Sequence, residues 1–269
     1  MKDFQDSKNS NEGSSDFKRK ILYPITSIEQ LVNSYYVSKS IYEVRDKIDN
    51  SLNKVGVDNL PIIDAKTDDR VNFLYKEACT ILRFNEHLVY MVKLAIEDMY
   101  AYNFTEDASV SATAQSDTAH LKVYFGNNFT TLSKINLFDH TLNVLEEAIN
   151  LAKGKGRTTG IAVPLISSLL HDFGKSTGIR EKLDGAASSR GIKAHAEVSY
   201  SYVNDILISK MLEKFTEIPV DTISLIANCV KSHHPANLKQ KVDQSIAFVI
   251  EADHSARKKE HAKLLLLAN

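Results

Sequence analysis

The amino-acid sequence predicts an all-α protein, and three observations lead to that prediction. Apolar residues recur every three or four positions in most segments after residue 20, which is the period of a helix face. From Leu137 onward this pattern is dense. Only residues 121–125 look like a short strand or an extended lead-in. We therefore expect a bundle built almost entirely of helices.

The first 118 residues are expected to form a tail and an N-terminal helical region. Residues 1–18 are rich in Ser, Asn, Asp and Lys and cannot bury enough apolar surface to offset ordering entropy, so we expect a disordered tail. Within residues 19–118, three segments show a helical pattern: 21–53, 68–82 and 86–100. Residues 60–63 read as a connector. The polar, aperiodic stretch 103–118 reads as a long loop that ends this region.

Residues 119–269 are expected to form a second domain, which contains the chemically interesting residues. Its expected helices are 137–153, 161–172, 195–215, 221–233 and 242–268. The segment 161–172 is apolar almost all round, which predicts a central buried helix that ends at Gly174. The polar, glycine-containing stretch 176–193 predicts a mobile loop over a site, and Asp221 is the expected cap of its helix.

Charge gives no indication of a nucleic-acid-binding protein. The formal net charge is -1, from 33 basic and 34 acidic residues, so the sequence has no excess of basic residues of the kind that nucleic-acid-binding proteins usually show. Two short basic clusters are expected to be solvated surface: Lys153, Lys155 and Arg157, and Arg257, Lys258 and Lys259. DNA remains a possible partner if another domain supplies a basic surface.

The two cysteines and the apolar segments bear on the cellular compartment. Cys79 and Cys229 lie far apart without a CxxC pair, which favours buried, reduced thiols. No apolar segment is long enough to span a bilayer, and the N-terminus is too polar for a secretory signal. We expect a cytoplasmic protein without membrane contact. The chain stops close to the end of its last helix, which suggests part of a longer protein, and the oligomeric state stays open.

The apolar stretch Leu-Ile-Ser-Ser-Leu-Leu ends in polar groups that are unsuited to a core. His171 and Asp172 follow it directly, and Gly174 and Lys175 come next. Buried polar and charged groups cost free energy unless they are paired or bound to a metal. Either this is a helix end that meets solvent, or these residues have a function.

Other histidines and an aspartate favour the second reading. His233 continues the inward face of its expected helix, and Asp253 continues that of the last helix, because residues three and four apart share one side. A shared metal ion would satisfy both. Taken singly, each residue is more often a surface or capping group. The ordered set spread over separate helices is what argues for a metal site: His140, His171, Asp172, His195, His233, His234 and Asp253.

This order of residues resembles the HD-domain superfamily of metal-dependent phosphohydrolases, over roughly residues 137–256. The segment His-Asp-Phe-Gly-Lys is similar to the His-Asp-x-Gly-Lys form of several branches. The resemblance implies an all-helical fold with metals held between helices. It implies one metal bound by His140, His171, Asp172 and Asp253, with Asp172 bridging to a second. The second metal would take His195, His233 and possibly His234.

The resemblance implies a phosphohydrolase or phosphodiesterase that acts on a nucleotide or another phosphoester. The Gly-Tyr-Pro motif of the branch that cleaves cyclic dinucleotides is absent after His234, which argues against that substrate. Two alternatives stay open: an HD-type relaxase or nuclease core of a conjugative DNA-processing protein, and a non-catalytic metal-binding regulatory domain. Residues 251–255 are loosely similar to the relaxase pattern.

The chemistry expected of such a site follows from its ligands. Mixed imidazole and carboxylate ligation suits Mn, Fe, Co, Ni or Zn, and two ions are expected. A pair of such ions about 3.5–4 Å apart activates water for attack on phosphorus. Asp172 and Lys175 are the expected catalytic residues, with Lys175 neutralising phosphoryl charge. Glu197 and Ser199 are candidates for contacts behind the ligands or with the substrate.

Overall fold

The computed structural model describes residues 60–63, 67–110, 132–154, 160–184, 194–234 and 243–268. The expected tail 1–18, the expected helix 21–53 and the strand candidate 121–125 lie outside these ranges. By its contacts the chain divides into two compact units, Met1–Leu52 and Asn53–Asn269, and all described residues belong to the second.

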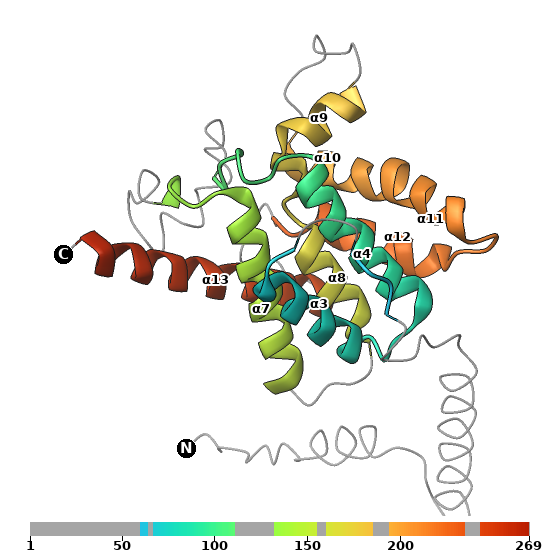
Figure 1. Cartoon of the computed structure of the whole chain (residues 1–269), viewed down its shortest axis with the longest axis horizontal. Coiled ribbons are helices and arrows are strands. Elements are labelled where there is room, and N and C mark those ends of the chain that lie inside the picture. Colours follow the sequence, from blue (N-terminus) through green and yellow to red (C-terminus); the bar gives the residue numbers. More distant parts are fainter. Residues whose placement is uncertain are drawn as a thin grey trace, which may run out of the picture. The chain divides into compact units, whose positions relative to one another are not determined.

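The described part is all-α, as the sequence predicts (Figure 1). No strand occurs in these ranges, and the one bridge there, between Ala108 and Asn136, is isolated. The elements are α3 (Asp69–Ile81), α4 (Glu86–Ala101), α7 (Leu137–Gly154), α8 (Ala162–Leu170), η2 (Phe173–Lys175), α9 (Thr177–Asp184), α10 (His195–Ser201), η3 (Tyr202–Leu207), α11 (Ile208–Lys214), α12 (Val220–Lys231) and α13 (Gln244–Ala268). None of the described helices is both long and apolar enough to cross a bilayer.

Helix α8 is the centre of the bundle, which confirms the expectation of a buried helix. Every residue from Pro164 to Leu170 is buried. The helix packs against α7, α12, α13 and α4, which surround it in Figure 1. An apolar surface all round the helix can be buried only by neighbours on every side.

Helices α3 and α4 belong to the same hydrophobic core as the later helices. Leu74 of α3 and Met99 of α4 lie in one cluster of buried side chains with Leu145 of α7 and Leu165 of α8. The Asp68 carboxylate accepts a hydrogen bond from the Val71 amide and so caps α3. The boundary expected near residue 118 is not tested by this packing and stays a prediction.

Two expectations about helix ends differ from the structure. Helix α8 ends at Leu170, and Gly174 lies in the 3-10 turn η2 rather than ending the helix. Helix α12 begins at Val220, directly after Pro219, without a side-chain cap, so Asp221 is its second residue and not the cap. Pro219 occupies the cap position, and its side chain has no acceptor to offer to the first amides of the helix.

Residues 177–184 form helix α9, so the loop expected over 176–193 is wrong for this part. Its start is fixed by Asp107, whose carboxylate accepts hydrogen bonds from the Thr177 amide and hydroxyl at 3.0 and 2.9 Å. Ile179 is fully buried and anchors the helix to the core. Only Ile179 and Leu183 of these eight residues are apolar and pack on the core, and one such pair four residues apart is too short a pattern to indicate a helix.

Residues 195–214 form one helical run that contains a π-helical segment, η3. Its Tyr202 hydroxyl donates to Asp98 of α4 at 2.7 Å, and Lys210 pairs with the same carboxylate. Asp98 is buried, so these two partners satisfy a charge that would otherwise be costly there. The pairing holds the run that starts at His195 against the central bundle.

Candidate metal centre

Five parts of the fold each direct polar side chains to one point inside the bundle. His140 lies near the start of α7, and His195 is the first residue of α10. Asp253 lies in the middle of α13. The other positions follow directly after helices: His171 and Asp172 after α8, and His233 and His234 after α12. The packing of α8 against α7, α12 and α13 brings these helices together.

The side chains form two groups, each of which could hold a metal ion. One contains Asp172, His195, His233 and His234, and the other contains His140, His171 and Asp172. Within each group the ligand atoms all lie within 4.8 Å of one another. Asp172 belongs to both groups, so its carboxylate is the element that joins them.

The two oxygens of Asp172 face different groups. Its Oδ2 lies 3.3 Å from His140 Nε2 and 3.2 Å from His171 Nε2. Its Oδ1 lies 3.3 Å from His195 Nε2 and 3.9 Å from His233 Nε2. The carboxylate could therefore contribute a ligand atom to either group.

Asp253 lies beside the group of His140, where the sequence predicts it. Its Oδ1 is 3.3 Å from His140 Nε2. The Nε atom of Arg257 is 3.9 Å from the same oxygen, and both residues are buried.

Four atoms at the centre are buried without a hydrogen-bond partner: His140 Nε2, His171 Nε2, Asp172 Oδ1 and Asp253 Oδ1. Leaving several such atoms unsatisfied at one point would be costly. Metal bound in these groups would satisfy them, because imidazole nitrogen and carboxylate oxygen are ligands of the first-row transition metals. The residues present therefore fit a metal ion.

Two of the histidines, His171 and His233, are held so that Nε2 faces the centre. The Nδ1 atom of His171 lies 2.9 Å from the Ser168 carbonyl, and that of His233 lies 2.5 Å from the Val230 carbonyl. An acceptor at Nδ1 fixes the proton there and leaves the Nε2 lone pair for a metal. Both carbonyls lie in the last turn of the preceding helix, so the helix ends themselves orient these rings.

The carboxylates of the centre are ionised. Burial acts to raise the pKa of Asp172 and Asp253, but neighbouring histidines and cations outweigh it and hold both pKa values well below the usual range. For His140, burial and Arg257 oppose protonation, yet Glu260 and the two aspartates raise the pKa to about 9. A positive charge is therefore favoured between these carboxylates, and a metal ion bound to His140 would take the place of the imidazole proton.

His233 and His234 of the other group are neutral. Burial and then the neighbouring imidazoles of His171 and His195 lower the pKa of His233 to about 3. Burial and the same crowding lower the pKa of His234 far below its ordinary value. His195 Nε2 lies 2.9 Å from His234 Nε2 and 3.4 Å from His233 Nε2. Neutral imidazole is the form that binds metals.

Lys175 forms an ion pair with Asp172 in this structure. Its Nζ donates to Asp172 Oδ2 at 2.7 Å and to the Ser109 carbonyl at 3.0 Å, and its side chain is buried. The ammonium thus compensates one charge of the bridging carboxylate. A contact between Lys175 and a phosphoryl group stays a prediction.

Ser199 binds the backbone of the segment that carries His171 and Asp172. Its hydroxyl donates to the His171 carbonyl at 2.9 Å and accepts from the Gly174 amide at 2.7 Å. Both partners are backbone groups of the segment that carries His171 and Asp172, so Ser199 ties this segment to α10. This agrees with the expectation of a contact behind the ligands.

Sequence reasoning missed two residues next to the centre. Arg257 was expected in a solvated cluster, but it is buried and donates to the Ser109 hydroxyl and carbonyl at 2.9 and 2.7 Å. Glu260 is buried and contacts His140 and Arg257. The available signal was spacing: Asp253, Arg257 and Glu260 follow one another at four and three residues, on one face of α13.

The fold and the centre thus define an all-helical protein with a buried cluster of histidine and aspartate side chains that could bind metal. No protein-family model, curated protein or solved structure matches the chain.

Proposed function

We propose that this protein is a metal-dependent phosphohydrolase or phosphodiesterase of the HD type, with two divalent transition metal ions in its centre. The observation that carries the proposal is the orientation of Asp172, whose two oxygens face two separate histidine groups. A structural metal site is satisfied by one closed set of ligands, whereas two adjacent sites that share a carboxylate are typical of phosphoester hydrolysis.

In this proposal the first ion takes His140, His171, Asp172 and Asp253, and the second takes Asp172 with histidines of the other group. When bound, such a pair activates water and neutralises charge on the phosphoryl oxygens. Asp172 holds the two positions together, and Lys175 limits the excess negative charge on that carboxylate. The surrounding helices exclude water from the ligands, all of which are buried except His234.

His234 indicates the side from which a substrate approaches. It is half-buried, whereas the other members of both groups are buried. A phosphoester that reaches the centre past His234 meets the group of His195 and His233 first. We therefore place the substrate on this side, at the second ion.

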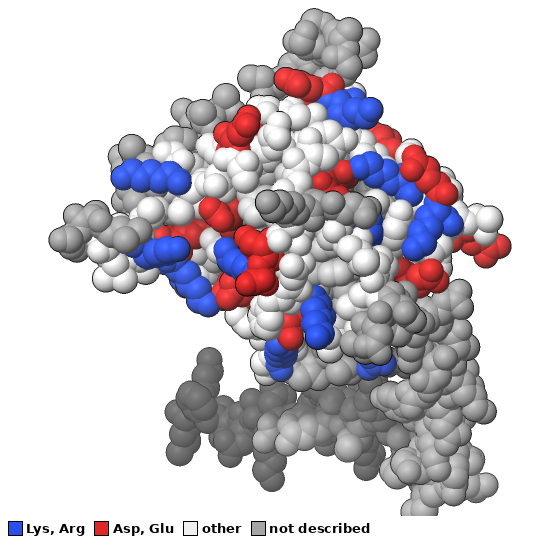
Figure 2. All heavy atoms as spheres, in the orientation of Figure 1, with Lys and Arg blue, Asp and Glu red and all other residues white. Residues whose placement is uncertain are grey.

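The formal net charge of -1 favours a small phosphoester over a nucleic-acid backbone. On the face that Figure 2 shows, described lysines and arginines are interspersed with acidic side chains and form no continuous basic band. Tracking a phosphate backbone calls for clustered positive charge. A nucleotide or another small phosphoester is thus the favoured substrate class.

Turnover of a phosphoester is the test of this function. Purified protein with added Mn²⁺, Co²⁺ or Zn²⁺ is assayed against bis-p-nitrophenyl phosphate, a set of nucleotides and single-stranded DNA. We expect metal-dependent hydrolysis of small phosphoesters that falls more than about 100-fold in His195→Ala, because a ligand matters at least as much as its supporting partners.

The matched control is His87→Ala. His87 lies in α4 and contacts Phe215 and the Glu217 carbonyl, away from the centre, so its loss should leave turnover unchanged. Cleavage of DNA alone would favour the nuclease alternative. Metal binding without any turnover would overturn the proposal in favour of a regulatory metal site.

A further inference from the structure

Glu260 lies behind His140, on the side of the ring that faces away from the centre. Its Oε1 is 2.9 Å from His140 Nδ1, and both side chains are buried. His171 and His233 have backbone carbonyls at the equivalent nitrogen, so His140 is distinguished by a charged partner. A carboxylate at Nδ1 orients a metal-binding imidazole and makes Nε2 a stronger donor.

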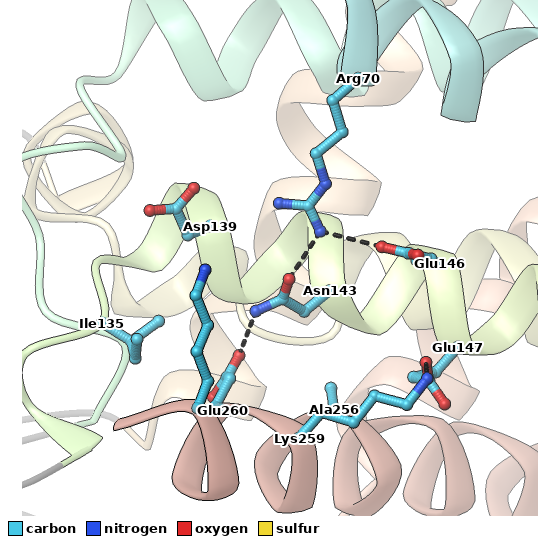
Figure 3. Close-up of a pocket in the computed structure, with 10 residues that line it drawn as sticks. Arg70, Ile135, Asp139, Asn143, Glu146, Glu147, Ala256, Lys259 and Glu260 are labelled. Atoms are coloured by element: carbon cyan, nitrogen blue, oxygen red, sulfur yellow. Dashed lines mark hydrogen bonds and ion pairs between the residues drawn. The ribbon is translucent and has the colours of Figure 1, made fainter. Parts of the chain in front are cut away.

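Glu260 is itself held in a fixed position by two partners. Asn143 Nδ2 donates to Oε1 at 2.7 Å, and Arg257 Nη1 donates to Oε2 at 2.9 Å. Asn143 Oδ1 in turn accepts from Arg70 Nη2 at 2.6 Å. Figure 3 shows this line from Arg70 through Asn143 to Glu260, which joins α3, α7 and α13.

The line of contacts borders a pocket of about 180 Å³ between α3, α7 and α13. Arg70 also pairs with Glu146 at 3.0 Å, and its side chain is 38% exposed, whereas Glu260 is 3% exposed. The path therefore leads from a partly exposed guanidinium to a fully enclosed imidazole. Each bond in it orients the next side chain inward.

From these contacts we propose that Glu260 is a positioning residue for the ion held by His140, with Asn143 and Arg257 setting its orientation. The inference rests on the proposed metal centre. It concerns the position held by His140, because Glu260 acts through His140, which belongs to only one of the two groups. Loss of Glu260 should therefore weaken the binding of one ion and leave the binding of the other unchanged.

The experiment titrates Co²⁺ into metal-free protein and follows both binding and the visible absorption of the bound ion. Wild type should bind two ions. In Glu260→Ala one of the two affinities should fall about 10–100-fold and its absorption band should change, while the other ion binds as before. Glu260→Gln keeps one acceptor and should restore part of the lost affinity.

Glu147→Ala is the matched control for a purely structural effect. Glu147 is also a buried carboxylate between α7 and α13, but its partner is Lys259 rather than a histidine of the centre. If Glu260→Ala and Glu147→Ala lower the affinity for Co²⁺ equally, or if neither lowers it, the positioning role is wrong. Wild-type protein that binds no Co²⁺ would instead refute the metal centre itself.

Discussion

Asp172→Ala is expected to abolish tight metal binding in both groups at once. Because each oxygen of Asp172 faces a different group, its loss removes a ligand from both positions and leaves the histidines without a shared anion. A metal that binds the folded protein at 100 times its dissociation constant stabilises it by about 2.7 kcal/mol. Thermal unfolding with and without Mn²⁺ or Zn²⁺ should show this gain in wild type and none in the variant.

Asp139→Ala is the control for this experiment. Asp139 is the residue before His140 in α7, but its side chain is exposed. The variant should keep the full metal-dependent rise in unfolding temperature. A rise of wild-type size in Asp172→Ala would contradict a bridging role for this carboxylate.

Gly174→Ala is expected to destabilise the protein and to disturb the centre together. A Cβ atom at Gly174 would lie 2.0 Å from the His195 carbonyl oxygen and 2.7 Å from the Ser199 amide nitrogen. Both are backbone atoms that cannot move aside without shifting α10. Overpacking of this kind costs about 1–3 kcal/mol and sometimes more. Urea unfolding of the metal-free variant measures the loss, and metal titration measures the displacement of His195 from Asp172.

Gly154→Ala is the matched control. A Cβ atom there meets nothing within 4 Å at the end of α7. Alanine suits a helix better than glycine by up to about 1 kcal/mol, so this change should be neutral or mildly stabilising. Equal stability and equal metal binding for Gly174→Ala and wild type would show that η2 and α10 do not need their close approach.

The general fold could be predicted because apolar periodicity is a local property. The bounds expected for the helices that became α3, α4 and α7 agree with the structure to within one or two residues. The last helix was placed correctly, but its expected inward face of Ile246, Val249 and Ile250 is confirmed only for Val249. Phe248 and Ala252 are buried, while Ile246 and Ile250 are only partly buried. Where polar and apolar residues are mixed around a helix, the sequence does not determine which side of the helix faces the core.

The candidate ligands could be found because they combine polar character with positions at the ends of apolar helices. Their partners could not be found in this way. Glu260 lies in a charged stretch of α13, where a solvated side chain is the ordinary expectation, and only the fold brings it to His140. The same holds for Gly174, whose need for a small side chain arises from the approach of α10.

Anomalous diffraction from crystals grown with Mn²⁺, Co²⁺ or Zn²⁺ tests the central claim most directly. The account predicts two peaks on opposite sides of the Asp172 carboxylate. Each would be about 2.0–2.2 Å from its histidine nitrogens, one beside His140 and His171 and the other beside His195 and His233. Metal-loaded crystals that show no peak within bonding distance of Asp172 would contradict it.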